Sequence, residues 1–214
     1  MPDRSASDTS AQIILASASP RRRELLQQIG IRPRAVPVDI DETPGPGENV
    51  VDFVLRLARE KAQRGFDVID NPQGLPVLGS DTAIEFEEHI LGKPRDREHA
   101  RQILQQLSAQ KHTVHTAVAI VTAGESATAL SSSHVWFKPL QAAEIDAYLE
   151  TGEADDKAGA YAIQGIAAQF VARIEGSYSG IMGLPLFETA GLLKQSGIDT
   201  LPTGLPAEQP TGLK

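Results

Sequence analysis

Residues 17–26, with the sequence SASPRRRELL, have the composition of an anion-binding site. Ser19 suits the N-cap of a helix and Pro20 its first turn, so free backbone N–H groups would point out of the amino end of that helix. Three arginines follow, where the helix dipole favours acidic side chains. A bound anion would remove this conflict, and the Ser17 hydroxyl, Arg21 and the backbone donors could together bind a phosphate. The alternative is a solvated basic surface beside an ordinary cap.

Asp81 is the best placed carboxylate, because it follows the short apolar segment 75–78 directly. Open α/β sheets bind their ligands beyond the ends of strands, and a carboxylate there can deprotonate a water molecule or hold a divalent cation. An Asx turn that ends the strand explains Asp81 equally well. Asp39, Asp41 and Glu42 form an acidic loop that could share a metal with Asp81, although a polar turn is the favoured interpretation of that loop.

Three further features could contribute to a site of this kind. Lys61 lies at the edge of the apolar stripe of a predicted helix and Lys93 lies in the sequence LGKP, but each alone is more simply a surface lysine. The segment 156–165, DKAGAYAIQG, has small residues that allow close backbone approach, and its Gln164 could form hydrogen bonds with the edge of a base. A tight structural turn would use much the same composition.

Familiar catalytic motifs are missing from the sequence. There is no phosphate loop, no dinucleotide glycine fingerprint and no HExxH helix, and in the GSYSG segment at 176–180 Tyr178 occupies the place of a nucleophilic serine. The five histidines are scattered, and we interpret them as surface or hydrogen-bonded hairpin residues rather than ligands.

The elements that must position these residues alternate along the chain. Apolar periodicity predicts strands at 13–16, 75–78 with an extended continuation at 83–86, a hairpin of 112–121 with 127–137, and 170–174; it predicts helices at 20–29, 50–63, 97–107, 142–150 and 186–195. This order indicates a mixed α/β fold, an elongated sheet with helices packed on it and a cleft. We expect one domain over residues 12–198, between flexible tails at 1–11 and 199–214.

The composition narrows the classes of protein further. The chain has 214 residues, 41% of them hydrophobic and 22% charged, which excludes collagen-like and largely disordered proteins. It has no cysteine, so any metal must be bound by oxygen or imidazole. A net charge of -8 and only 5% aromatic residues argue against a nucleic-acid partner. No apolar run is long enough to span a membrane and no basic leader is present, so we expect a cytoplasmic protein without a membrane partner.

Taken together and in order, these segments resemble the Maf family of nucleoside triphosphate pyrophosphatases. The resemblance is carried by six motifs, namely SASPRRRELL at 17–26, DE at 41–42, GSDT at 79–82, LGKP at 91–94, DKAGAYAIQG at 156–165 and GSYSGIMGLPL at 176–186. It implies a two-lobed fold with a central cleft like that of the inosine triphosphate pyrophosphatases, a homodimer, a nucleoside triphosphate substrate, and a divalent cation that is normally magnesium, with manganese as the other possibility.

Motif positions also imply roles for individual residues. Asp81 matches the proton acceptor of the family, and the other matched active-site residues are Ser17, Arg21, Glu42, Lys61, Lys93 and Gln164. Arg21, Thr82 and Gln164 correspond to positions that set substrate choice, while Asp81 and Glu42 are the candidate metal ligands. The intact run 156–165 resembles the dTTP/UTP branch of the family rather than the 7-methyl-GTP branch.

The residues and the resemblance lead to one hypothesis. Water activated by Asp81, with assistance from the metal, attacks the α-phosphorus of dTTP or UTP and releases pyrophosphate and a nucleoside monophosphate. Two alternatives stay open: a nucleotide-sensing regulator of cell division, and a housecleaning hydrolase that acts on another class of base.

Overall fold

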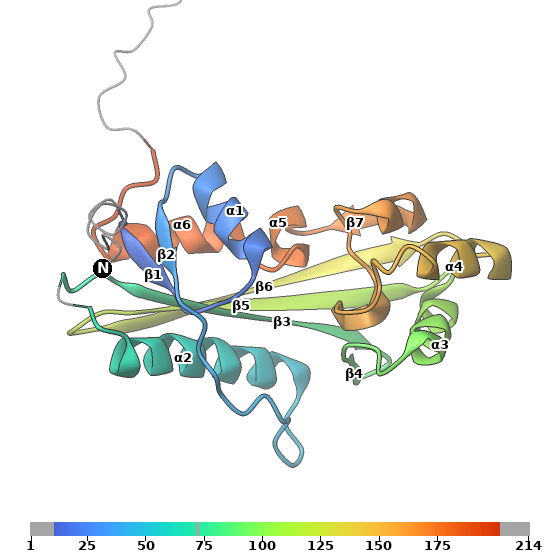
Figure 1. The fold of residues 1–214 in the computed structure, drawn as a ribbon, viewed down its shortest axis with the longest axis horizontal. Coiled ribbons are helices and arrows are strands. Elements are labelled where there is room, and N and C mark those ends of the chain that lie inside the picture. Colours follow the sequence, from blue (N-terminus) through green and yellow to red (C-terminus); the bar gives the residue numbers. More distant parts are fainter. Residues whose placement is uncertain (1–10, 72, 202–214) are drawn as a thin grey trace, which may run out of the picture.

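The computed structural model describes residues 11–71 and 73–201, and in them seven strands form one mixed sheet in the order β2-β1-β3-β5-β6-β7, with β4 paired to β3 (Figure 1). The strands are β1 (Ile13–Leu15), β2 (Pro33–Ala35), β3 (Val77–Phe86), β4 (His89–Leu91), β5 (Lys111–Val121), β6 (Ser126–Phe137) and β7 (Val171–Glu175). The helices are α1 (Pro20–Gln28), α2 (Val50–Val68), α3 (Arg97–Leu107), α4 (Ala142–Leu149), α5 (Tyr178–Ile181) and α6 (Leu186–Gln195), with short 3-10 turns η1 (Ala158–Ala160) and η2 (Ile166–Phe170).

The sheet is long because its central strands are long and antiparallel. β3 pairs with β5 from Val77 to Glu85, and β5 pairs with β6 along its whole length. In Figure 1, α2 covers one face of the sheet at one end of the molecule, while α1, α5 and α6 lie on the opposite face. The other end carries α3, α4 and β7 around an aromatic core that includes Phe137 and Phe170.

The edge of β3 that faces away from β5 is only partly paired. β1 pairs with β3 at Val77 and Leu78, and β4 pairs with it at Ile84, Glu85 and Phe86. Residues 79–83 therefore have no strand beside them on that edge. The sheet opens there, and the chain that leaves β1 runs past the opening into α1 (Figure 1).

Local sequence explains the two helices that flank this opening. Ser19 caps α1, its Oγ accepting from the backbone N–H of Arg22 at 3.4 Å, and Pro20 begins the helix. Asn49 caps α2, its side-chain oxygen accepting from the N–H of Asp52 at 2.9 Å. The apolar stripe of α2 then packs on the sheet around residues such as Val54 and Ala58.

The predicted fold class is confirmed, and the differences have local causes. One strand, β3, begins at Val77 and runs through 83–86, so Asp81 lies inside it and not beyond its end, because the turn-like residues 79–82 pair with β5. Helix α2 continues to Val68, past the predicted end at Gln63. The prediction omitted β2, β4 and α5, which are too short to show periodicity.

Other expectations concern the tails, the membrane and the histidines. Residues 1–10 and 202–214 of the predicted tails lie outside the described residues. No helix in the described part of the chain is long and apolar enough to cross a membrane. Three of the histidines are hydrogen-bonded hairpin residues, as expected: His112 Nε2 lies 2.8 Å from the Tyr161 hydroxyl, His115 contacts Glu85, and His134 contacts Thr113. His112 and His115 are buried.

Candidate active site

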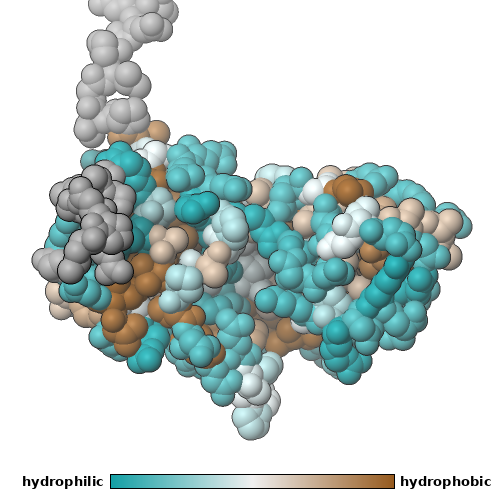
Figure 2. Space-filling model, viewed as in Figure 1, coloured by the Kyte–Doolittle hydropathy of each residue, from teal (hydrophilic) through white to brown (hydrophobic). Residues whose placement is uncertain are grey.

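A cavity of about 740 Å³ lies beside the open edge of β3. Its wall includes residues of both ends of the molecule, such as Phe53 and Leu57 from α2 and Tyr161 and Ile163 from the aromatic core. The space-filling view shows this face hollowed between its two ends, with hydrophilic side chains around much of the hollow (Figure 2). All eight site residues predicted from the sequence line the cavity: Ser17, Arg21, Glu42, Lys61, Asp81, Thr82, Lys93 and Gln164.

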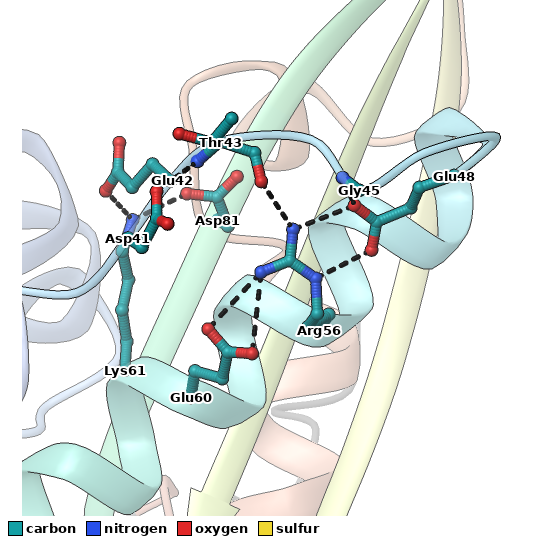
Figure 3. Close-up of polar contacts among 9 residues, drawn as sticks. All are labelled: Asp41, Glu42, Thr43, Gly45, Glu48, Arg56, Glu60, Lys61 and Asp81. Atoms are coloured by element: carbon teal, nitrogen blue, oxygen red, sulfur yellow. Dashed lines mark hydrogen bonds and ion pairs between the residues drawn. The ribbon is translucent and has the colours of Figure 1, made fainter.

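Lys61 joins two carboxylates at the centre of the site (Figure 3). Its Nζ lies 2.6 Å from Asp81 Oδ1 and 2.6 Å from Glu42 Oε1. The side chains of Lys61 and Asp81 are each 11% exposed, whereas that of Glu42 is 57% exposed. Three segments far apart in the sequence thus meet at one ammonium group, and the two carboxylates differ in their access to water.

Gly79 allows α2 to approach β3 closely enough for this contact. A Cβ atom at position 79 would lie 2.4 Å from the Ala58 carbonyl oxygen and 2.5 Å from the Ala62 backbone nitrogen. Only glycine fits against a helix backbone at that distance. Lys61 stands between these two contact residues in α2 and so reaches the side chain two residues along β3 from the glycine.

The two carboxylates have opposite pKa shifts. Burial raises the pKa of Asp81 above its usual range, and the positive charges of Lys61 and Arg22 offset this only in part. Burial also acts on Glu42, but the hydrogen bond and charge of Lys61, with the charges of Lys93 and Arg22, hold its pKa below the usual range. Of the two carboxylates, Asp81 therefore has the higher affinity for a proton relative to its ordinary value.

The loop that carries Glu42 is attached to α2 by Arg56 (Figure 3). The Arg56 guanidinium donates to both carboxylate oxygens of Glu48, at 2.7 and 2.8 Å, and to the Thr43 carbonyl oxygen at 3.1 Å. Within the loop, Asp41 accepts from the Thr43 N–H at 2.9 Å, which is the polar turn favoured from the sequence. Asp41 therefore shapes the turn while Glu42 reaches Lys61.

Arg22 is the site residue that the sequence reasoning missed. Its Nε donates to the Gly183 carbonyl oxygen at 2.8 Å, and its two terminal nitrogens donate to Ser17 Oγ at 3.3 Å and Thr82 Oγ1 at 3.4 Å. Arg22 therefore contacts Ser17 directly, while Arg21, which was expected to bind a phosphate together with Ser17, also lines the cavity. A signal was present, because position 22 lies three and four residues before Leu25 and Leu26, on the buried face of α1.

Three other predicted binding residues also belong to the lining of the cavity. Arg21, Lys93 and Gln164 line it and form no hydrogen bond with another described residue. The segment after Gln164 is fixed by Glu153, whose carboxylate accepts from the N–H groups of Ile166 at 2.9 Å and Ala167 at 3.2 Å. The Gln164 amide is consequently free to bind a ligand on a backbone that is held in place.

Beside Lys61, the described residues offer a divalent cation the carboxylates of Asp81 and Glu42. Asp81 and Glu42 each use one oxygen on Lys61, and the other oxygen of each forms no hydrogen bond with a described residue. Among residues 11–71 and 73–201 no group of three or more His, Asp or Glu side chains could hold a metal. This donor set fits Mg²⁺, which proteins usually bind through one or two carboxylates together with substrate phosphates.

Fold and site define an α/β protein with a cavity lined by several cationic side chains and by carboxylates. The chain belongs to the Maf family, since the model described as Maf-like protein matches residues 12–196. The resemblance stated from the six motifs is confirmed.

Several curated relatives carry the name dTTP/UTP pyrophosphatase. The protein of Alkalilimnicola ehrlichii is 53% identical over 190 residues, covering 87% of this chain and 94% of its own, and that of Nitrosomonas europaea is 47% identical over 197 residues, covering 87% and 95%. The Bordetella avium protein is 48% identical over 197 residues, covering 89% and 98%. Among solved structures, the Staphylococcus aureus Ham1 protein has a TM-score of 0.39 and 12% identity over 58% of this chain and 71% of its own, a likeness too slight to support an argument.

Proposed function

We propose that this chain hydrolyses dTTP and UTP to the nucleoside monophosphate and pyrophosphate. One observation carries the proposal: a buried carboxylate, Asp81, is held by Lys61 beside Glu42 in a cavity large enough for a nucleotide. The relatives named dTTP/UTP pyrophosphatase are 47–53% identical to this chain and cover most of it. Their name supplies the proposed reaction and the proposed base.

Asp81 acts as the general base toward water. Its pKa, raised by burial, lies nearer to neutral pH than that of an exposed aspartate, which makes the carboxylate a better proton acceptor. Lys61 and Arg22 keep it ionised and oriented, since Lys61 bonds one oxygen and leaves the other for a water molecule. The water oxygen attacks the α-phosphorus while its proton passes to Asp81.

Positive side chains stabilise the charge that develops on the leaving pyrophosphate. Arg21 and Lys93 line the cavity without hydrogen-bond partners among the described residues, so their donors are available to phosphate oxygens. Lys93 is exposed and Arg21 is partly buried, so both side chains are accessible to a nucleotide that enters the cavity. A protein with net charge -8 thus presents a locally positive site.

A divalent cation, which we propose to be Mg²⁺, completes this site, with Asp81 and Glu42 as the residues that would hold it and Mn²⁺ as the other candidate. Bound with the nucleotide, it supplies charge neutralisation on the phosphates. We also propose that the protein is a cytoplasmic homodimer with a single domain over residues 12–198. Thr82 and Gln164 are proposed to determine which base is accepted.

The test is product analysis with a panel of nucleotides and magnesium. Wild-type protein should release pyrophosphate, and not orthophosphate, from dTTP and UTP in preference to CTP, 7-methyl-GTP and ITP. Asp81→Asn should lower turnover by on the order of 100-fold or more while it retains folding and nucleotide binding. Asp67→Asn, an exposed position at the far end of α2, is the matched control and should retain wild-type turnover.

The other outcomes separate the alternatives. Pyrophosphate release from a different nucleotide would keep the chemistry and replace the base, as expected of a housecleaning hydrolase. Stoichiometric binding of dTTP without release of pyrophosphate would favour a nucleotide sensor. Wild-type turnover in Asp81→Asn would remove Asp81 from the role of base.

A further inference from the structure

Lys157 lines the cavity but has no part in the site as described so far. Its side chain is only 18% exposed, which is low for a lysine. Among the described residues it forms an ion pair with the adjacent Asp156, whose side chain is 74% exposed and so largely solvated. Such a solvated pair does little to compensate the burial of the Lys157 side chain.

The backbone places Lys157 beside Lys93. The Gly159 N–H donates to the Gly92 carbonyl oxygen at 3.1 Å, which joins the loop after β4 to the turn η1. Gly159 has a φ of 67°, and a Cβ there would lie 2.6 Å from Ile84 Cδ1, so this turn is closely packed against β3. The two lysines consequently project from two loops that are fixed to one another.

The cations of the cavity fall into two groups. Lys61 and Arg22 interact with the Asp81 carboxylate. Lys157 belongs with Arg21 and Lys93: burial lowers the pKa of the Lys157 ammonium and the charges of Arg21 and Lys93 lower it further, while the charges of Glu153 and Asp155 raise it. These three cations line one cavity, and an anion bound there would be attracted by all of them.

We propose that Lys157, together with Arg21 and Lys93, binds the two terminal phosphates of the triphosphate, the part that leaves as pyrophosphate. The inference rests on the proposed function, because the α-phosphorus must lie at Asp81 and Lys61 for the attack. The β- and γ-phosphates would then lie in the part of the cavity that the second group of cations lines. Lys157 would thereby help the site to distinguish triphosphates from monophosphates.

Binding of the two halves of the substrate tests this without turnover. Isothermal titration of the full chain, in magnesium buffer, would measure the Kd of inorganic pyrophosphate and of dTMP separately. Lys157→Gln should raise the Kd for pyrophosphate on the order of 10-fold, because a charge-assisted hydrogen bond is lost, and leave that for dTMP unchanged. Lys157→Arg should recover most of the affinity, and Lys194→Gln, the same charge change on the exposed face of α6, should behave as wild type.

Several results would overturn the proposal. They are an unchanged Kd for pyrophosphate in Lys157→Gln, an equal loss for dTMP and pyrophosphate, or an equal effect of Lys194→Gln. If Lys157→Gln does not fold, judged by its thermal melting curve, Lys157→Met preserves the aliphatic stem and gives the same comparison. Failure of the proposed function is distinguishable, because wild-type protein would then bind pyrophosphate and dTMP yet release no pyrophosphate from any triphosphate.

Discussion

Replacing Gly79 by alanine should separate Lys61 from Asp81 without touching either residue. The new Cβ would lie 2.4 Å from the Ala58 carbonyl oxygen, where ordinary contact begins at 3.4 Å, so α2 must retreat by about 1 Å. Lys61 lies in the stretch of helix that moves, and its Nζ is 2.6 Å from Asp81. A displacement of about 1 Å at a catalytic group can cost on the order of 100-fold in rate.

The assay combines stability with turnover. Overpacking of this kind costs about 1–3 kcal/mol, which in a chain of this length lowers Tm by about 2–4 °C per kcal/mol. We therefore expect Gly79→Ala to be folded at 25 °C, with a Tm lower by several degrees and kcat/KM for dTTP lower by on the order of 100-fold. The fall in activity should exceed what the unfolded fraction explains.

Gly191→Ala is the matched control, since a Cβ at this position in α6 meets nothing within 4 Å. Alanine favours helix by up to about 1 kcal/mol over glycine, so this variant should keep its activity and be as stable as wild type or more so. Wild-type Tm and turnover in Gly79→Ala would refute the argument about close approach. A lowered Tm with undiminished kcat/KM would refute the link from helix position to Lys61.

Three other perturbations test how the surroundings support the site. Burial lowers the pKa of His112 from 6.5 to about 4, so the unfolded chain takes up a proton before the folded chain does as the pH falls. The free energy of unfolding should therefore drop by up to about 3 kcal/mol between pH 6.5 and pH 4. Urea denaturation measured over this pH range should show that drop in the wild type and not in His112→Gln. Glu153→Ala frees the segment after Gln164 and should reduce the kcat/KM preference for dTTP over CTP by on the order of 10-fold, with Glu153→Gln intermediate; an unchanged preference would make Glu153 purely structural. Arg56→Lys cannot form the bidentate contact that attaches the Glu42 loop, so KM for dTTP should rise several-fold while kcat changes little, and an equal fall in both quantities would contradict this.

The sequence predicts the longer elements of the fold well. Helices α3 and α6 have the predicted bounds, because their apolar periodicity runs their full length between a cap or proline and a polar end. The hairpin of β5 and β6 was also evident from alternation around its turn. Strands of three residues, such as β2 and β4, carry no periodic signal and depend on partners distant in the sequence, so local patterns could not predict them.

The sequence predicted most residues of the candidate site but not which of them contact one another. All eight residues expected from the motifs line one cavity, but the reasoning overlooked Arg22, whose spacing from Leu25 and Leu26 places it on the buried face of α1. Arg22 is chosen because hydroxyl groups of Ser17 and Thr82 and the carbonyl of Gly183 converge on it, and these come from three separate segments. Such convergence is a property of tertiary structure and has no counterpart in local sequence.

The incomplete pairing of β3 explains why these residues meet where they do. A carboxylate beyond the end of a strand would be exposed, whereas Asp81 within β3 is fixed by ladder contacts to β5 on one side and faces the unpaired edge on the other. It is therefore rigid, buried enough to have a raised pKa, and still accessible from the cavity. If β1 or β4 extended along residues 79–83, the chain that carries Ser17 and Arg22 would be displaced, so the gap in the sheet is itself part of the site.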